Sequence, residues 1–380
     1  MRNKSKGFHV LLLAAVFFLL LTGCRGSLPP SPDDAYESGN DVAYESGSGS
    51  EYAAKPSIVC TAFPQYDWTL QILGSQADRF QVTLLNHQGA DMHSFQPTAA
   101  NMVSMATCDL FIHIGGYSES WVPAALKSAE NQDAAVLTLL DHVDRLEEVS
   151  TPGMTPGSDH DHDHSHDHDD SPMETGSIEA DEDHDEPLYD EEDVDVDVDV
   201  EYDEHLWLSL SCAQDACRAI AGAVTELDPD HAEEYAANLA DYSSRLAQLD
   251  TLYEETVGRA PVKALLFADR FPFRYMAYDY GIECFAAFPG CSAETEASFE
   301  TIVALSEEMS AHQIQSAVIL EGSRTDFAKT VISSAGMPKA RILTLNSMQS
   351  AGQRDIAAGT TYLSIMEENL KVLQQALQAE

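Results

Sequence analysis

Residues 228–258 read Asp-Pro-Asp-His-Ala-Glu-Glu-Tyr-Ala-Ala-Asn-Leu-Ala-Asp-Tyr-Ser-Ser-Arg-Leu-Ala-Gln-Leu-Asp-Thr-Leu-Tyr-Glu-Glu-Thr-Val-Gly, and they carry one uninterrupted apolar stripe. Its members recur at steps of four and three residues: Tyr235, Leu239, Tyr242, Leu246, Leu249 and Tyr253. This spacing predicts a single helix of about seven turns, because residues three and four apart share a helix face. Asp228 is a favourable N-cap, Pro229 suits the first helical position, and Gly258 ends the stripe. So long a helix can join two lobes, or it can belong to one domain.

On both sides of this helix, short apolar runs alternate with helical segments. Before it, we expect strands at 57–63, 80–85 and 109–114, with helices at 66–73 and from 97. After it, we expect strands at 262–267, 282–285, 316–321 and 340–345, with helices at 273–280, 301–311, 327–335 and 362–377. Such alternation implies parallel sheets, so the predicted fold is α/β, with two parallel-sheet lobes joined by the long helix. Small ligands then bind in the cleft, near the carboxyl ends of strands.

The chain of 380 residues is strongly acidic. It has 64 Asp and Glu residues against 20 Lys and Arg, a formal net charge of -44. Nucleic-acid binding needs a basic footprint, so this balance argues against it. An acidic chain attracts cations, although part of the charge can simply solvate a tail placed within the chain.

The N-terminus has the anatomy of an export signal. Arg2, Lys4 and Lys6 precede an apolar run at 10–21, which ends in Leu21-Thr-Gly-Cys24. That tetrapeptide resembles the bacterial lipobox, so residues 1–23 are predicted to be a signal peptide and Cys24 to carry lipid. An ordinary cleaved signal or a short anchor is the alternative, although about a dozen apolar residues are few for a span of about 20. Residues 24–55, rich in Ser, Gly and Pro, read as a flexible tether.

A low-complexity insertion at 150–203 begins with histidines and continues as an acidic tract. Five histidines alternate with acidic or serine residues: His160, His162, His164, His166 and His168. Neither face of such a run is apolar, so it cannot be a core element. Neutral imidazoles beside carboxylates suit zinc, so we expect an accessory metal-gathering tract. A spacer with adventitious metal affinity is the alternative.

Two further histidines stand on sequence that is predicted to be ordered. His205 begins the apolar segment His-Leu-Trp-Leu-Ser-Leu210, and His93 lies in a loop that follows a strand. An imidazole with a fixed position can contribute to a tight metal site, whereas a flexible tract cannot. A single loop histidine is more often a solvated bystander.

Six cysteines remain besides Cys24: Cys60, Cys108, Cys212, Cys217, Cys284 and Cys291. In an exported chain they permit three disulfides. Their spacing includes no Cys-x-x-Cys pair, so a structural zinc cluster is not indicated. Cys284 and Cys291 bracket a turn and are the most plausible local bridge.

From about Ser57 to the C-terminus the chain resembles the solute-binding lipoproteins of bacterial metal ABC transporters, in the zinc and manganese class with a rigid linker helix. Gly89-Ala-Asp-Met-His-Ser-Phe-Gln-Pro97 is similar to the first ligand motif of that family, with Met92 where proline is usual. Asp203-Glu-His-Leu-Trp-Leu208 is similar to the second. A histidine-rich insertion before the second motif is typical of the zinc members.

The resemblance implies a function as well as a fold. It implies a protein without enzymatic activity that captures zinc between two lobes and delivers it to an ABC permease. We expect it to be an extracytoplasmic monomer, lipid-anchored to the outer face of the bacterial cell membrane. The expected parts are an N-terminal metal-binding lobe at 56–227, a linker helix at 228–258 and a C-terminal lobe at 259–380.

His93 and His205 match the first two metal ligands of the family, but the second lobe departs from the pattern. Ala268 stands in the place of the third ligand and cannot bind metal, and Asn346 stands in place of the fourth. Zinc sites take about four ligands, or three and water. Asp269 and Glu321, both near strand ends, are therefore the candidate carboxylate ligands.

Three other functions compete with zinc transport. A manganese-binding member of the same family is favoured by the oxygen ligands of the second lobe, but the histidine tract favours zinc. A zinc hydrolase would need a general base beside the metal. Glu204 is the only adjacent candidate, and it is better explained as support for its loop. A surface adhesin is allowed by the resemblance, although no residue demonstrates it.

Overall fold

The computed structural model of the protein describes residues 55–152, 154, 201–292 and 297–379. All of them belong to one compact unit, Ala54–Glu380. The predicted signal peptide, Cys24 and the five tract histidines lie outside the described residues. In the part of the chain that is described, every helix is too short or too polar to cross a membrane.

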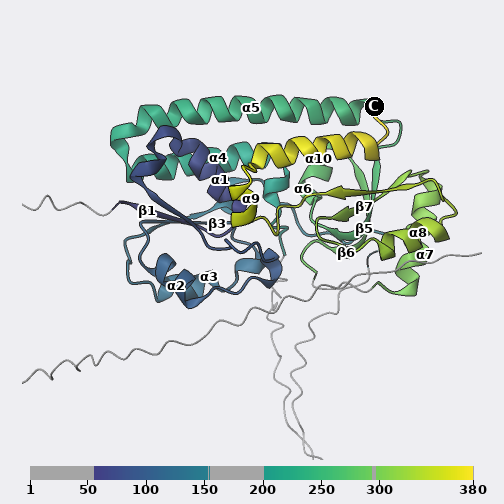
Figure 1. Ribbon diagram of the computed structural model, residues 1–380, viewed down its shortest axis with the longest axis horizontal. Coiled ribbons are helices and arrows are strands. Elements are labelled where there is room, and N and C mark those ends of the chain that lie inside the picture. Colours follow the sequence, from purple (N-terminus) through teal and green to yellow (C-terminus); the bar gives the residue numbers. More distant parts are fainter. Residues whose placement is uncertain (1–54, 153, 155–200, 293–296, 380) are drawn as a thin grey trace, which may run out of the picture. The chain divides into compact units, whose positions relative to one another are not determined.

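Two four-stranded sheets form the framework of this unit (Figure 1). The first has the order β2-β1-β3-β4 and consists of β1 (Ser57–Cys60), β2 (Gln81–Leu84), β3 (Leu110–His113) and β4 (Ala135–Thr138). The second has the order β6-β5-β7-β8 and consists of β5 (Ala264–Phe271), β6 (Glu283–Pro289), β7 (Ser316–Leu320) and β8 (Arg341–Leu345). All neighbouring strands are parallel, which confirms the predicted α/β fold with two parallel-sheet lobes.

Helices cover both faces of each sheet (Figure 1). One face of the first sheet packs on α2 (Ala99–Ala106) and α3 (Val122–Lys127), and one face of the second on α7 (Phe299–Ala311) and α8 (Asp326–Ser334). The other faces pack on α1 (Phe63–Leu73), α4 (Leu210–Leu227), α5 (Ala232–Arg259) and α10 (Tyr362–Ala376). The short helices α6 (Arg274–Tyr280) and α9 (Gln353–Ala357) complete the α-helices of the described residues.

The alternation of side chains along each strand explains these layers. In β1, Ile58 packs in the large core under α5, whereas Val59 packs against α2 and α3. In β5, Leu265 belongs to the same large core, whereas Leu266 packs with α7 and α8. One continuous apolar core therefore includes residues of both sheets.

The predicted long helix is present as α5, a helix of 28 residues. It begins slightly later than expected, because Pro229–His231 form a 3-10 turn and the Asp228 backbone N–H closes α4 by donating to Val224 O at 2.9 Å. The Asp228 side chain instead accepts a hydrogen bond from Tyr235 Oη at 2.8 Å. Five residues of the predicted stripe are buried: Tyr235, Tyr242, Leu246, Leu249 and Tyr253.

The last helix, α10, returns to the first lobe. The backbone N–H of Tyr362 donates to Asp67 Oδ2 of α1 at 3.1 Å, and its hydroxyl donates to Trp207 O at 2.7 Å. In addition, Tyr253 of α5 donates to Met366 O of α10 at 2.7 Å. The C-terminal helix therefore ties the lobes together beside α5.

Candidate metal centre

His93 is held by the loop that follows β2. Asn86 folds this loop back on itself, since its side chain donates to Ala90 O at 2.6 Å and accepts from Ala90 N at 3.0 Å. Asp91 then caps the 3-10 turn Met92–Ser94 by accepting from His93 N at 3.1 Å. The cap places the imidazole at the carboxyl end of the first sheet, where ligands bind in parallel sheets.

His205 is fully buried at the start of the 3-10 turn Leu206–Leu208. Asp203 accepts two hydrogen bonds with the same Oδ1, from the His205 backbone N at 2.8 Å and from its Nδ1 at 3.0 Å. Trp207 anchors the turn to the second lobe, because its Nε1 donates to Ser347 O at 2.8 Å. The His205 ring therefore has one orientation, set by backbone and carboxylate together.

Glu204 performs for His93 the role that Asp203 performs for His205. Its Oε1 lies 3.1 Å from His93 Nδ1, and Ser118 Oγ lies 2.6 Å from the same ring nitrogen. Ser118 also holds the carboxylate, since its hydroxyl donates to Oε1 and its backbone N donates to Oε2 at 3.0 Å. Each imidazole thus has a carboxylate behind its Nδ1.

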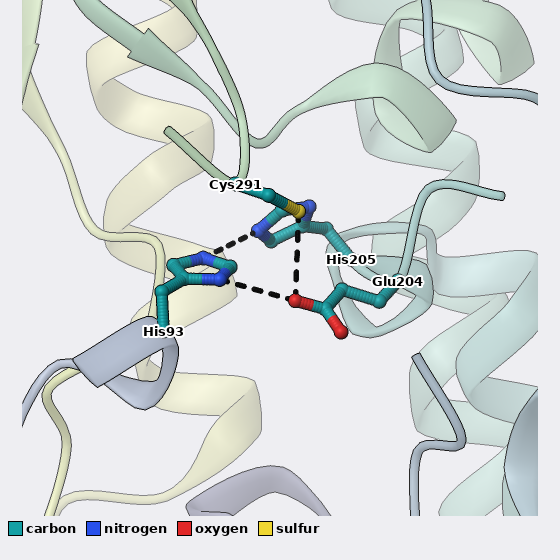
Figure 2. Close-up of side chains that lie close together, drawn as sticks. All are labelled: His93, Glu204, His205 and Cys291. Carbon is teal, nitrogen blue, oxygen red and sulfur yellow. Dashed lines mark hydrogen bonds and ion pairs between the residues drawn. The ribbon is translucent and has the colours of Figure 1, made fainter. Parts of the chain in front are cut away.

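The remaining nitrogen of each ring points at the other, as Figure 2 shows, and the two Nε2 atoms are 3.2 Å apart. A carboxylate at Nδ1 favours the proton there and leaves the Nε2 lone pair for a metal. Two nitrogens bound to tetrahedral zinc at 2.0–2.1 Å would be about 3.3 Å apart. The histidine pair therefore has the spacing that zinc requires.

Cys291 brings a fourth side chain to the group, from the loop that follows β6. Its Sγ lies 3.5 Å from Glu204 Oε1 (Figure 2). Ligand atoms of His93, Glu204, His205 and Cys291 all lie within 4.8 Å of one another. The predicted Cys284–Cys291 disulfide is wrong: both cysteines are free, and Cys284 is buried within β6.

The charges around the site are strongly coupled. Burial would raise the pKa of Glu204, but hydrogen bonds and charge from the two histidines and Ser118 outweigh it and lower that pKa to about 2. Burial would lower the pKa of His205, but the Asp203 carboxylate reverses this and raises it. Burial and the Glu204 charge raise the pKa of the Cys291 thiol. A cation at this place would therefore meet a carboxylate that is already ionised.

The structure does not bring Asp269 or Glu321 into this group of side chains. Asp269 accepts from the backbone N of Leu320 at 3.0 Å and of Arg270 at 2.9 Å. Glu321 accepts from Ser347, at 2.7 Å from its N and 2.8 Å from its Oγ. Both carboxylates therefore accept hydrogen bonds from atoms at or just after strand ends, and neither belongs to the group around the imidazoles.

Asn346 and Ala268 also have structural roles, one in folding a loop and the other in core packing. Asn346 Oδ1 accepts from Met348 N at 2.8 Å, which folds the loop after β8. Ala268 is buried in β5 and packs against α7 and α8. Neither residue is among the four that gather around the imidazoles.

Two residues that sequence reasoning missed contact the site from the second lobe. The Gln349 side-chain nitrogen lies 2.9 Å from His93 Nε2 and 2.7 Å from His205 Nε2. Arg270 donates to Asp91 Oδ2 at 2.6 Å. Both follow the rule that parallel strands present functional groups at their carboxyl ends, but nothing in their local sequence distinguishes them.

Buried imidazoles on loops at the carboxyl end of a sheet, closed over by a second lobe, are the arrangement of a metal-binding solute receptor. The chain belongs to the ZnuA family, described as the periplasmic component A of a zinc-uptake complex, whose family model matches residues 58–376. This family consists of solute-binding proteins.

Known relatives agree with this membership. The chain is 27% identical over 372 residues to the high-affinity zinc uptake system protein ZnuA of Bacillus subtilis, and the match covers 98% of each chain. It is 28% identical to the zinc-binding lipoprotein AdcA of Streptococcus pneumoniae over 86% of its own length, but it spans only 56% of that protein. The Zn(II)-bound ZnuA-like domain of that AdcA has the same fold, with a TM-score of 0.61, 25% identity, and coverage of 85% of this chain and 99% of the domain.

Proposed function

We propose that this protein captures zinc between His93 and His205 outside the cytoplasm and hands it to an ABC permease. The observation that carries the proposal is the convergence of the two Nε2 atoms at 3.2 Å. Behind them, Asp203 and Glu204 hold the Nδ1 atoms at 3.0 and 3.1 Å. Capture and release require no chemical reaction. The zinc-binding names of the relatives from B. subtilis and S. pneumoniae support the choice of metal.

The second lobe contributes Cys291 to our proposed set of ligands, in place of the expected Asp269 and Glu321. Its thiol is already directed at Glu204, and zinc takes a thiolate at about 2.3 Å. Zinc binding would displace the thiol proton, because a coordinating thiol is deprotonated. Glu204 can then bind the metal or continue to support His93. Imidazole and thiolate ligands favour zinc over manganese, which prefers oxygen.

Zinc titration against a competing chelator tests the site. Replacing His93 or His205 by Ala should weaken the tight site at least about a hundredfold, a loss of roughly 2.8 kcal/mol at about 1.4 kcal/mol per decade. His87→Ala is the matched control, because that loop histidine bonds Leu85 O and lies outside the four-residue group. Unchanged affinity in both site variants would refute the proposal.

Cobalt(II) tests the thiolate separately. Cobalt in the site should produce a sulfur-to-metal charge-transfer band, and Cys291→Ser should abolish it while the band of tetrahedral cobalt persists. Cys284→Ser is the control, since Cys284 is buried within β6 and belongs to no metal-binding group among the described residues. A spectrum without the charge-transfer band would remove Cys291 from the set of ligands and leave the histidines in place.

The proposal also includes a lipid anchor at Cys24 and an ABC permease as the partner that receives the zinc. The name of AdcA as a lipoprotein supports lipid attachment at Cys24, so Cys24→Ala should release the protein from the membrane fraction.

A strain that lacks the protein should grow poorly when a chelator limits zinc, and the wild-type chain, but not His93→Ala, should restore growth. Unimpaired growth of the strain with His93→Ala would argue against delivery to a permease.

A further inference from the structure

The Gln349 amide makes an unusual pair of contacts. Its Nε2 lies 2.9 Å from His93 Nε2 and 2.7 Å from His205 Nε2. With both imidazole protons held at Nδ1, each Nε2 offers one lone pair, and an NH2 group offers two donors. Donors and acceptors therefore match one to one. The other amide atom, Gln349 Oε1, is buried without a hydrogen-bond partner among the described residues.

An imidazole nitrogen has a single lone pair, so it can accept a hydrogen bond or bind a metal, but not both. The amide of Gln349 uses the lone pairs that zinc would use on both rings. With Gln349 only 3% exposed, water does not readily replace the amide. This side chain and a zinc ion are therefore alternatives at the same two atoms.

The loop after β8 is built to hold Gln349 in this place. Glu321 fixes its base by accepting from Ser347 N and Oγ at 2.7 and 2.8 Å. Met348 follows with a positive φ of 62°, a costly conformation for a residue with a side chain. Asn346 stabilises that turn through its bond from Met348 N at 2.8 Å. The loop is thus constrained on both sides of the strained residue.

The backbone of Gln349 also bridges the lobes. Its carbonyl accepts from Met92 N at 3.2 Å, one residue before His93. This hydrogen bond therefore links the two lobes and holds Gln349 next to the turn that carries His93.

We propose that Gln349 is a displaceable internal competitor for zinc, which caps both imidazoles in the metal-free protein and must swing away when the ion binds. This inference rests on the proposed zinc site. Breaking two hydrogen bonds lowers the net affinity, and it does so for every metal. Only ions with a strong preference for imidazole then remain bound, and the amide is ready to reclaim the nitrogens when zinc leaves.

The test uses the full chain with the five tract histidines replaced by Asn, so that the titration measures zinc binding at the tight site alone. Gln349→Leu should bind zinc about tenfold more tightly than its parent, the size expected from losing one or two hydrogen bonds in the metal-free state. The exposed Gln248→Leu on α5 is the control and should change nothing. Unchanged or weaker zinc binding by Gln349→Leu would overturn the proposal, and weaker binding would make Gln349 a ligand.

Two readouts separate competition from simple structural support. Gln349→Leu should lower the thermal stability of the metal-free protein and leave that of the zinc-loaded protein unchanged, whereas a structural role would lower both. In the unmutated chain, the NMR signals of the Gln349 NH2 group should exchange slowly with water and change on addition of one equivalent of zinc. NMR signals of the Gln349 NH2 group that do not change when zinc is added would overturn the proposal. If zinc affinity is also insensitive to His93→Ala and His205→Ala, the proposed function itself fails.

Discussion

Arg270 and Asp91 join the two lobes beside the imidazoles. The guanidinium donates to Asp91 Oδ2 at 2.6 Å, while Asp91 Oδ1 caps the turn that carries His93. Burial would raise the pKa of Asp91, but the hydrogen bond and charge of Arg270 outweigh it and lower that pKa. The Asp91 carboxylate therefore positions the turn that carries His93 in the first lobe and pairs with the Arg270 guanidinium of the second.

Arg270→Gln should accelerate zinc release about three- to tenfold, because a partly exposed ion pair contributes on the order of 1 kcal/mol to closure. Stopped-flow measurement with excess chelator gives the rate, and high salt should reduce the difference between variant and parent. Arg324→Gln is the matched control, since Arg324 forms its pair with Asp326 on the surface. Equal release rates for Arg270→Gln and the parent would mean that the pair does not hold the lobes closed.

Gly116→Ala should weaken both the fold and the site. A Cβ at this position would lie 2.0 Å from Glu204 Oε2 and 2.3 Å from its Cβ, so the carboxylate behind His93 would have to move. We expect a loss of about 1–3 kcal/mol in the free energy of unfolding, as for other overpacked sites, and weaker zinc binding. Urea unfolding and zinc titration measure the two effects. Gly222→Ala in α4, where a Cβ meets nothing within 4 Å, should instead stabilise by about 0.5–1 kcal/mol.

Asp67 should make the stability depend on pH. Burial raises the pKa of this carboxyl group above its ordinary value, despite the hydrogen bond from Tyr362 N. The folded state therefore binds the proton more tightly than the unfolded state. The stabilising contribution is complete below the ordinary pKa of 3.8 and is lost as pH rises through the folded value.

Asp67→Asn keeps an oxygen to accept from Tyr362 N and removes the charge. Its stability relative to wild type should therefore increase from pH 4 to pH 7, as measured by urea unfolding of the metal-free proteins. A difference that is the same at both pH values, or that shrinks toward pH 7, would contradict the assignment.

Deleting residues 157–170 should remove weak binding of several zinc ions and preserve one tight site. The five alternating histidines of that segment are not expected to have packed partners, whereas His93 and His205 stand on ordered elements. Calorimetry with and without the segment measures both classes of site. Loss of all zinc binding would identify the tract itself as the site.

Most of the fold could be predicted from the periodicity of apolar residues along the chain. The stripe from Tyr235 to Tyr253 predicted α5, and seven of the eight strands were expected within a few residues of their bounds. Strand β4 and helices α3, α4 and α9 were not expected. The exposed Ala135 and Val136 open β4 with little apolar pattern. The apolar face of α4 consists largely of small residues, Ala213, Ala216 and Ala221, which give a weak signal.

The side chains that the first lobe brings to the candidate site could be predicted from the sequence, whereas Cys291 and Gln349 of the second lobe could not. His93 and His205 lie in motifs in which local hydrogen bonds to the carboxylates of Asp91 and Asp203 orient them. Asp269 and Glu321 do lie near strand ends, but Asp269 accepts from Leu320 N at the end of β7 and Glu321 accepts from Ser347 N in the loop after β8. Which way a strand-end side chain turns depends on such tertiary contacts. Likewise, Cys291 meets a partner 87 residues away in the chain.

The single apolar core limits how the ion can enter and leave. Ile58 and Phe267 belong to different sheets, yet both pack in the core that α5 and α10 cover. Pulling the sheets apart as rigid bodies would expose that core to water, at about 25 cal/mol per Å². Turning only the Gln349 side chain breaks its two contacts with the imidazoles and leaves the core packed. We therefore expect a bound ion to exchange through movement of the Gln349 side chain and not through separation of the two sheets.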